Sequence, residues 1–269
     1  MSDIDIRTIV KKKYSEIARQ SDGSNSQSCC CGPAADCCGT DYTIFSESYL
    51  ELQGYEKDAD LGLGCGIPTE FAAIEPGHHV LDLGSGAGND CFVARVIVGE
   101  AGSVTGLEFS EEMLAKARKN VSKLGYLNVH FVAGDIEDMP FEDDRFDVVI
   151  SNCVLNLVPD KGRAFAELLR VLKPGGHFCV SDVVIKGELP EKLRADAEMY
   201  AGCVSGAMQL EDYLEVITRA GFANIQIHKQ RVIQVPGEIL KPYLDDHEMN
   251  AFLTGHIGIF SVTVSAAKQ

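Results

Sequence analysis

Apolar positions recur along the chain with two different periods, and the change of period predicts the order of the elements. Over residues 4–19 apolar side chains return every three to four positions, as in an amphipathic helix, whereas residues 20–42 are rich in Ser, Gly and Cys and predict a mobile loop. From about residue 72, short apolar runs alternate with amphipathic segments. The runs predict strands at residues 80–83, 103–109, 129–132, 146–151, 178–184, 224–229 and 259–264, and the segments predict helices at residues 88–98, 161–172, 190–201 and 211–220, with another beginning after Ser110.

Strands that alternate with helices predict an α/β fold on a mainly parallel sheet, with helices on both faces and right-handed crossovers. Ligands of such sheets bind beyond the carboxyl ends of the strands, so we expect the functional residues there. We expect two parts of the chain. Residues 1–71 would hold the N-terminal helix, a Cys-rich loop and a cap segment, and residues 72–269 the main domain with an insert after the fifth strand.

Composition narrows the classes of partner and the location. The formal net charge of −16 would repel nucleic acid phosphates, and the short basic run at residues 11–13 is expected to be a solvated helix face. No apolar run reaches the roughly 18 to 20 residues that a membrane helix needs, and the N-terminus has no apolar signal-peptide core. We therefore expect a cytoplasmic protein that binds neither nucleic acid nor a membrane.

The chain has ten cysteines, a high number for a cytoplasmic protein, in which disulfides rarely persist. Their thiols therefore serve core packing, metal or metalloid binding, or redox chemistry. Half of them crowd into one short segment. That segment holds Cys29, Cys30, Cys31, Cys37 and Cys38, and the others are Cys65, Cys91, Cys153, Cys179 and Cys203.

Glycines after the first strand of the main domain indicate a nucleotide site. Gly84, Gly86 and Gly88 let the backbone turn sharply and approach a ligand closely. Glu108 ends the next strand, where a carboxylate can accept hydrogen bonds from both ribose hydroxyls. An NAD site would use the same logic, so the glycine loop alone does not decide the cofactor.

Three details favour S-adenosylmethionine over NAD. The spacing is G-x-G-x-G, with Asn89 where the dinucleotide pattern has its third glycine. Asp82 lies just before the loop and suits the cationic amino-acid end of the cofactor. Asp135 ends the third strand, where an acid can accept a hydrogen bond from the adenine amino group.

The segments around these residues resemble the Rossmann-like class I methyltransferases. The likeness is carried by residues 80–88, 106–118, 134–140, 146–151 and 170–176. It implies a seven-stranded sheet whose last strand is antiparallel, with S-adenosylmethionine as the cofactor. The expected cofactor contacts are Asp82, Gly84, Ser85, Gly86, Gly88, Glu108, Phe109, Asp135, Ile136 and Asn152.

Three of the cysteines lie in loops next to the expected cofactor site. Cys153 follows the fourth strand, Cys65 is flanked by two glycines, and Cys203 lies in a glycine-containing segment after the fifth strand. Cys91 and Cys179 fall inside a helix and a strand, so we expect them to be small buried side chains of the core.

These segments resemble the arsenite methyltransferases in particular. The likeness is carried by Gly64-Cys65-Gly66 and by residues 81–88, 151–157, 159–161, 181–183 and 201–207. It implies that Cys65, Cys153 and Cys203 hold arsenic(III) as three thiolates, which are soft ligands suited to a thiophilic centre. Thiolate-bound arsenic keeps a lone pair, which can take up a methyl group without a general base.

The same resemblance implies partners and a role in arsenic detoxification. The substrate would be arsenite or its thiol conjugates, and a thiol reductant such as thioredoxin or glutathione would support turnover. A fourth cysteine would take part in disulfide exchange, and Cys37 or Cys38 is the best match.

Two other functions stay open at this point. A C-methyltransferase of a quinone or sterol-like molecule would show the same cofactor motifs, but it leaves the three loop cysteines unexplained. A metalloid sensor without catalysis would bind arsenic and transfer no methyl group. Incubation with labelled S-adenosylmethionine, a thiol and arsenite separates the three.

Overall fold

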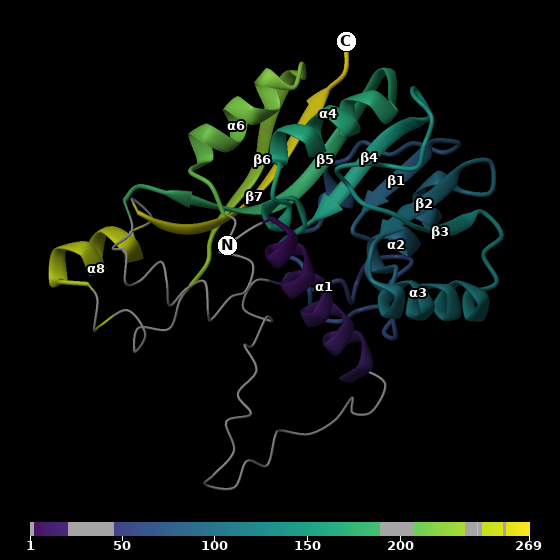
Figure 1. Ribbon diagram of the computed structural model, residues 1–269, viewed down its shortest axis with the longest axis horizontal. Helices are drawn as coiled ribbons and strands as arrows, with labels where there is room; N and C mark the ends of the chain where they lie inside the picture. Colours follow the sequence, from purple (N-terminus) through teal and green to yellow (C-terminus); the bar gives the residue numbers. More distant parts are fainter. Residues whose placement is uncertain (1–2, 21–45, 189–206, 235–240, 242–243, 255–256) are drawn as a thin grey trace, which may run out of the picture.

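A seven-stranded sheet forms the centre of the computed structural model, which describes residues 3–20, 46–188, 207–234, 241, 244–254 and 257–269 (Figure 1). The strand order is β3-β2-β1-β4-β5-β7-β6. The strands are β1 (His79–Leu83), β2 (Ser103–Glu108), β3 (Val129–Ala133), β4 (Phe146–Asn152), β5 (Leu172–Lys186), β6 (Ala223–Val232) and β7 (Gly258–Ala267).

The directions of the strands confirm the predicted sheet. β1 runs parallel to β2 and β4, β2 runs parallel to β3, and β4 runs parallel to β5. The last strand, β7, is antiparallel to both of its neighbours, β5 and β6. The carboxyl ends of β1 to β4 therefore meet at one edge of the sheet, where the candidate residues were expected.

Helices cover both faces of the sheet, so the central strands are buried on both sides. The helices are α1 (Asp3–Gln20), α2 (Asn89–Val98), α3 (Glu111–Leu124), α4 (Lys161–Val171), α6 (Leu210–Arg219) and α8 (Asp246–Leu253). Neighbouring residues of β1 show the two layers. Leu81 belongs to the core cluster that includes Phe165 of α4, whereas Val80 belongs to the cluster that includes Phe92 of α2. Side chains alternate between the faces of a strand, which explains the continuous apolar runs.

The strands β5, β6 and β7 are longer than predicted, and one helix was missed. β5 begins at Leu172, several residues before the predicted start, because Leu172 pairs with Phe146 of β4. Further along, Gly175 N–H donates to the carbonyl of Lys268 at 3.1 Å. The sequence analysis missed α8, although Asp245 and Glu248 form a capping box at its start. The helix predicted at residues 190–201 lies outside the described residues.

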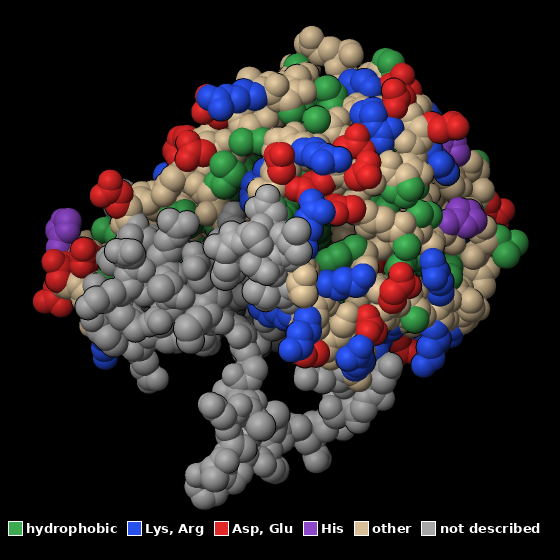
Figure 2. Space-filling model, in the orientation of Figure 1, with side chains coloured by type: hydrophobic (Ala, Val, Ile, Leu, Met, Phe, Trp, Pro, Cys, Tyr) green, Lys and Arg blue, Asp and Glu red, His purple; other side chains and the backbone are tan. Residues whose placement is uncertain are grey.

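The surface mixes both signs of charge. On the face shown in Figure 2, acidic and basic side chains are interspersed over the described part of the chain. No helix among the described residues is both long and apolar enough to cross a membrane.

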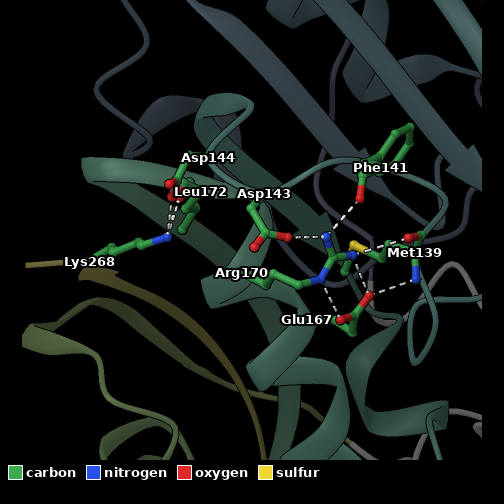
Figure 3. Close-up of polar contacts among 8 residues, drawn as sticks. All are labelled: Met139, Phe141, Asp143, Asp144, Glu167, Arg170, Leu172 and Lys268. Atoms are coloured by element: carbon green, nitrogen blue, oxygen red, sulfur yellow. Dashed lines mark hydrogen bonds and ion pairs between the residues drawn. The ribbon is translucent and has the colours of Figure 1, made fainter.

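Arg170 of α4 holds the loop that leads into β4 (Figure 3). Its guanidinium donates to the carbonyls of Phe141 at 2.7 Å and Met139 at 3.1 Å, and to both carboxylate oxygens of Glu167 at 2.7 Å. Asp143 accepts a further bond at 2.8 Å. A planar fork of donors is needed to hold two carbonyls and a carboxylate together, which lysine cannot supply.

We expect Arg170→Ala to lower the free energy of unfolding by about 1.5 to 3 kcal/mol, the value of a charge-assisted hydrogen bond, because two loop carbonyls lose their donor. Urea unfolding measures the change. The matched control is Arg219→Ala, which removes an exposed ion pair with Glu215 within α6 and should cost less than about 0.5 kcal/mol. Equal losses in the two variants would contradict a special role for Arg170.

Candidate cofactor pocket and thiol site

One pocket gathers most of the predicted cofactor contacts at the carboxyl ends of β1 to β4. The glycine loop, the ends of β2 and β4 and the segment after β3 all contribute to its wall. The predicted residues that line it are Asp82, Gly84, Ser85, Gly86, Glu108, Phe109, Asp135, Ile136, Asn152 and Cys153. Residues that are far apart in the sequence thus share one cavity.

Gly88 lies behind the pocket wall and serves packing. Its backbone adopts φ +100°, and a Cβ there would lie 2.8 Å from the rings of Phe92 and Phe131. A side chain would therefore push the start of α2 away from the sheet. The spacing pattern identified a position at which the structure requires glycine, since Gly88 packs against Phe92 and Phe131 at the start of α2.

Buried carboxylates give the pocket its chemical character. Asp82, Asp90 and Glu108 line it, and each is at most 9% exposed. Burial raises the pKa of Asp82 well above its usual value, and the nearby charge of Asp90 raises it further. Burial also raises the pKa of Asp90, to about 6, against hydrogen bonds from Tyr49 and Asn152. Arg7 is the basic residue among those that line this pocket. Such a site favours a ligand with positive charge.

Glu108 braces the backbone around it. Its carboxylate accepts from the N–H groups of Gly86 at 3.0 Å, Phe109 at 2.9 Å and Ser110 at 2.8 Å. The glycine loop and the start of α3 are thereby joined through one side chain. Burial raises the pKa of Glu108, while these donors act in the opposite direction.

The first helix covers part of the pocket, which the sequence analysis missed. Arg7, Val10 and Tyr14 of α1 line the cavity, and Arg7 pairs with Asp135 at 2.8 Å and with Glu137. At the other end of α1, Ser15 donates to Glu112 of α3 at 2.6 Å. The helical period of α1 was visible in the sequence, but the partner of its inner face is set by tertiary packing.

Asn152 joins the Cys65 loop to the end of β4. Its Oδ1 accepts from the N–H of Cys65 at 2.9 Å, and its Nδ2 donates to the carbonyl of Gly66 at 2.8 Å. Gly64 has φ +112°, and a Cβ there would lie 2.8 Å from the Asn152 amide. The two glycines around Cys65 are thus explained by close approach: a Cβ on Gly66 would meet the Ser181 hydroxyl at 2.5 Å.

Cys153 follows Asn152 directly along the chain. The two hydrogen bonds of the Asn152 side chain with Cys65 and Gly66 therefore bring the segments of two predicted thiol ligands together. The backbone of Cys153 has φ 60°, a conformation that costs a non-glycine residue roughly 1 to 3 kcal/mol. Its N–H donates to the carbonyl of Ser181 at 2.7 Å, which helps to hold that conformation. Cys65 and Cys153 are both buried, and both carry thiols. Cys203, Cys37 and Cys38 lie outside the described residues.

Cys91 and Cys179 are buried in the core as expected, but they differ in surroundings. The thiol of Cys91 donates to Asp82 at 3.2 Å, so Cys91 touches a pocket residue. Burial raises the pKa of Cys179 to about 12, and this thiol lies within β5. Cys179 is therefore the better packing control for the loop cysteines.

Comparison with known proteins identifies the chain as a methyltransferase domain. The family model described as "Methyltransferase domain" matches residues 74–221, more than half of the chain. The chain belongs to this methyltransferase domain family, and its sheet is that of the class I methyltransferases.

Individual proteins that resemble the chain indicate a narrower group than the family model does. A curated arsenite methyltransferase of Halobacterium salinarum is 43% identical over 235 residues, which cover 82% of this chain and 58% of that protein. A solved arsenic(III) S-adenosylmethionine methyltransferase from Chlamydomonas reinhardtii aligns with a TM-score of 0.62 and 37% identity, over 75% of this chain and 66% of that one. A ubiquinone/menaquinone C-methyltransferase of Vibrio vulnificus is 41% identical over 112 residues, 41% of this chain and 43% of that protein. The chain spans little more than half the length of the curated arsenite methyltransferases that it matches.

We expect Asp82→Asn to stabilise the ligand-free protein at pH 8. Because the pKa of Asp82 is raised on folding, the folded protein keeps a proton that the unfolded chain releases above about pH 4. The contribution of Asp82 to the free energy of unfolding is therefore lost as pH rises through the pKa of the folded state. A neutral amide avoids that loss. Thermal melts should show a larger gain at pH 8 than at pH 4.5.

Asp58→Asn is the control of opposite sign. The pKa of Asp58 is lowered by its bond with Lys123, so its contribution is present above pH 4 and lost in acid. This variant should lower the melting temperature at pH 8. A fall in melting temperature in Asp82→Asn that equals the fall in Asp58→Asn would show that the charge of Asp82 does not destabilise the folded protein.

Proposed function

We propose that the protein transfers a methyl group from S-adenosylmethionine to trivalent arsenic held by Cys65, Cys153 and Cys203. The observation that carries the proposal is the clamp of Asn152 on the Cys65 loop, beside Cys153 and a pocket lined by buried acids. Arsenite or its thiol conjugates would be the substrate, in the cytoplasm, with a thiol reductant for turnover.

The pocket fits this cofactor in charge and in polar groups. S-adenosylmethionine, when bound, supplies an electrophilic methyl group on a cationic sulfur. Asp82 and Asp90 would face its ammonium group, and Glu108 its ribose hydroxyls. Two buried polar atoms of the wall, Ser85 Oγ and Asn89 Oδ1, have no hydrogen-bond partner among the described residues, and a polar ligand would satisfy them. An NAD pyrophosphate would place negative charge among carboxylates.

The thiols suit arsenic because both are soft. Binding of arsenous acid exchanges three As–O bonds for three As–S bonds, and the three thiol protons leave with the hydroxyls as water. The bound arsenic keeps a lone pair, which would form the new As–C bond as the S–C bond of the sulfonium breaks and its electron pair stays on sulfur. S-adenosylhomocysteine would leave, and no group of the protein must remove a proton. Arsenic would become formally pentavalent, and the thiol reductant would return it to the trivalent state for the next turnover. The protein then acts mainly by positioning.

The arsenite function is favoured over quinone C-methylation by the extent of the likeness and by the thiols. The match to the quinone enzyme covers 112 residues, 41% of the chain, whereas the matches to arsenite methyltransferases cover 68% to 82% of it. A sensor that only binds arsenic would not need the cofactor pocket.

We expect Cys153→Ser to lower arsenite methylation by about 100-fold or more, because loss of one ligand misplaces the arsenic by an ångström or so. The assay follows label from S-adenosylmethionine into methylated arsenic in the presence of a thiol. Cys179→Ser is the matched control, a buried thiol within β5, and should keep the parent rate. Full methylation by Cys153→Ser would remove this cysteine from the site.

Replacement of Glu108 tests the ribose contact. Glu108→Gln removes the charge and keeps one acceptor oxygen, which can serve Phe109 and Ser110, while the new amide NH2 faces the Gly86 N–H. S-adenosylhomocysteine should bind about 10- to 150-fold more weakly by calorimetry. Glu111→Gln, an exposed change in the first turn of α3, should leave the affinity unchanged. Parent affinity in Glu108→Gln, with an unchanged melting temperature, would exclude Glu108 from the ribose site.

A further inference from the structure

Tyr49 connects the cofactor pocket to the Cys65 loop, and neither the motifs nor the proposed reaction accounts for it. Its side chain is 4% exposed, and its ring packs against Ile67 and Val93. Its hydroxyl lies 2.8 Å from Asp90 Oδ1 and 3.0 Å from the carbonyl of Gly66. Tyr49 therefore stands between an acid of the pocket and the loop that carries Cys65.

The hydroxyl has one proton and two acceptors within reach. Asn152 also donates to the hydroxyl oxygen at 2.8 Å, to the carbonyl of Gly66 at 2.8 Å and, over a longer 3.2 Å, to Asp90 Oδ2. If the Tyr49 proton points to Asp90, that carboxylate has its donor, and the two amide protons of Asn152 can go to the Tyr49 oxygen and the Gly66 carbonyl. If it points to Gly66 instead, Tyr49 and Asn152 compete for the same carbonyl. The charge on Asp90 decides between the two arrangements, because an ionised carboxylate is the stronger acceptor.

Because Asp90 is buried, a bound ligand can change whether its carboxyl group is ionised. Its pKa is raised to about 6 by burial, so the charged and neutral forms balance near pH 6 and the neutral form predominates in more acidic solution. A cation bound beside Asp90 would keep it ionised. Asn152 also accepts from the Cys65 N–H at 2.9 Å. The state of Asp90 therefore reaches the Cys65 backbone through three short hydrogen bonds by way of Tyr49, and through two by the longer direct bond from Asn152.

We propose that Tyr49 is a positioning residue that couples occupation of the cofactor pocket to the order of the Cys65 loop. With an ammonium group bound beside it, Asp90 would stay charged and the Tyr49 proton would turn to Asp90. Asn152 would then hold Cys65 and Gly66 without competition from Tyr49 for the Gly66 carbonyl. The Cys65 loop would therefore be held most firmly when a methyl donor is present. This inference rests on the proposed function for the identity of the cofactor.

Amide hydrogen exchange of a peptide that contains residues 62–68, followed by mass spectrometry on the full chain, tests the coupling at about pH 5, where Asp90 is mostly neutral in the ligand-free protein. S-adenosylhomocysteine should slow exchange of this peptide at least about fivefold, the lower end of usual coupling between sites. The nucleoside 5′-methylthioadenosine, which lacks the amino-acid end, should bind the pocket without that slowing. No arsenic is present, so the readout is independent of methylation.

Tyr49→Phe should bind S-adenosylhomocysteine and lose the slowing. Tyr126→Phe is the control, since it also removes one phenol hydroxyl, from a ring that packs on Phe92 of α2 and does not line the pocket, and it should keep the slowing. Asp90→Asn is the second variant if Tyr49→Phe does not fold, because it removes a buried charge while keeping an acceptor. It too should lose the slowing.

The outcomes separate the two proposals. Slowing that persists in Tyr49→Phe or in Asp90→Asn, or that is absent from the parent although S-adenosylhomocysteine binds, would overturn the coupling and leave the proposed function standing. Slowing by 5′-methylthioadenosine equal to that by S-adenosylhomocysteine would also overturn it. Failure of S-adenosylhomocysteine to bind the parent chain would overturn the proposed function and the coupling with it.

Discussion

The amide of Asn152 is the contact on which the candidate site depends. It lies at the end of β4, a strand held between β1 and β5 in the middle of the sheet, so its position is set by the most rigid part of the fold. From there it binds the backbone on both sides of the Cys65 sulfur and faces the pocket. An amide is suited to this place because it donates and accepts at once, which neither a carboxylate nor a hydrocarbon could do.

The pocket combines features that oppose stability and favour ligand binding. Asp82 and Asp90 are buried close together, and burial raises the pKa of both. In a core built only for stability, such acids would be replaced by apolar side chains of similar size. Cys153 adds a second cost through its left-handed backbone. Such departures from local rules concentrate at functional sites, and here they lie on one wall of one cavity.

The positions of the central strands, which depend on local spacing of apolar residues, were predicted well. The period of the apolar residues located the strands that carry Asp82 and Glu108 and the strand that leads to Cys153, because side chains of a strand must alternate between its two faces. The helix α8 was missed although its capping box is local, since an eight-residue helix near the end of the chain shows little periodicity. The division of the chain at residue 71 stays a prediction.

The sequence by itself determined the class of fold, the glycine loop and the residue types of the pocket, since these follow from periodicity and from backbone sterics. Only the tertiary structure decided which distant segments meet. It brought Arg7 and Tyr14 of α1 over the pocket, packed Gly88 against Phe92 and Phe131, and joined Tyr49 and Asp90 to the Cys65 loop. The physical reason is that each of these contacts is made by side chains that close packing brings together from separate elements, and no spacing along the chain encodes that meeting.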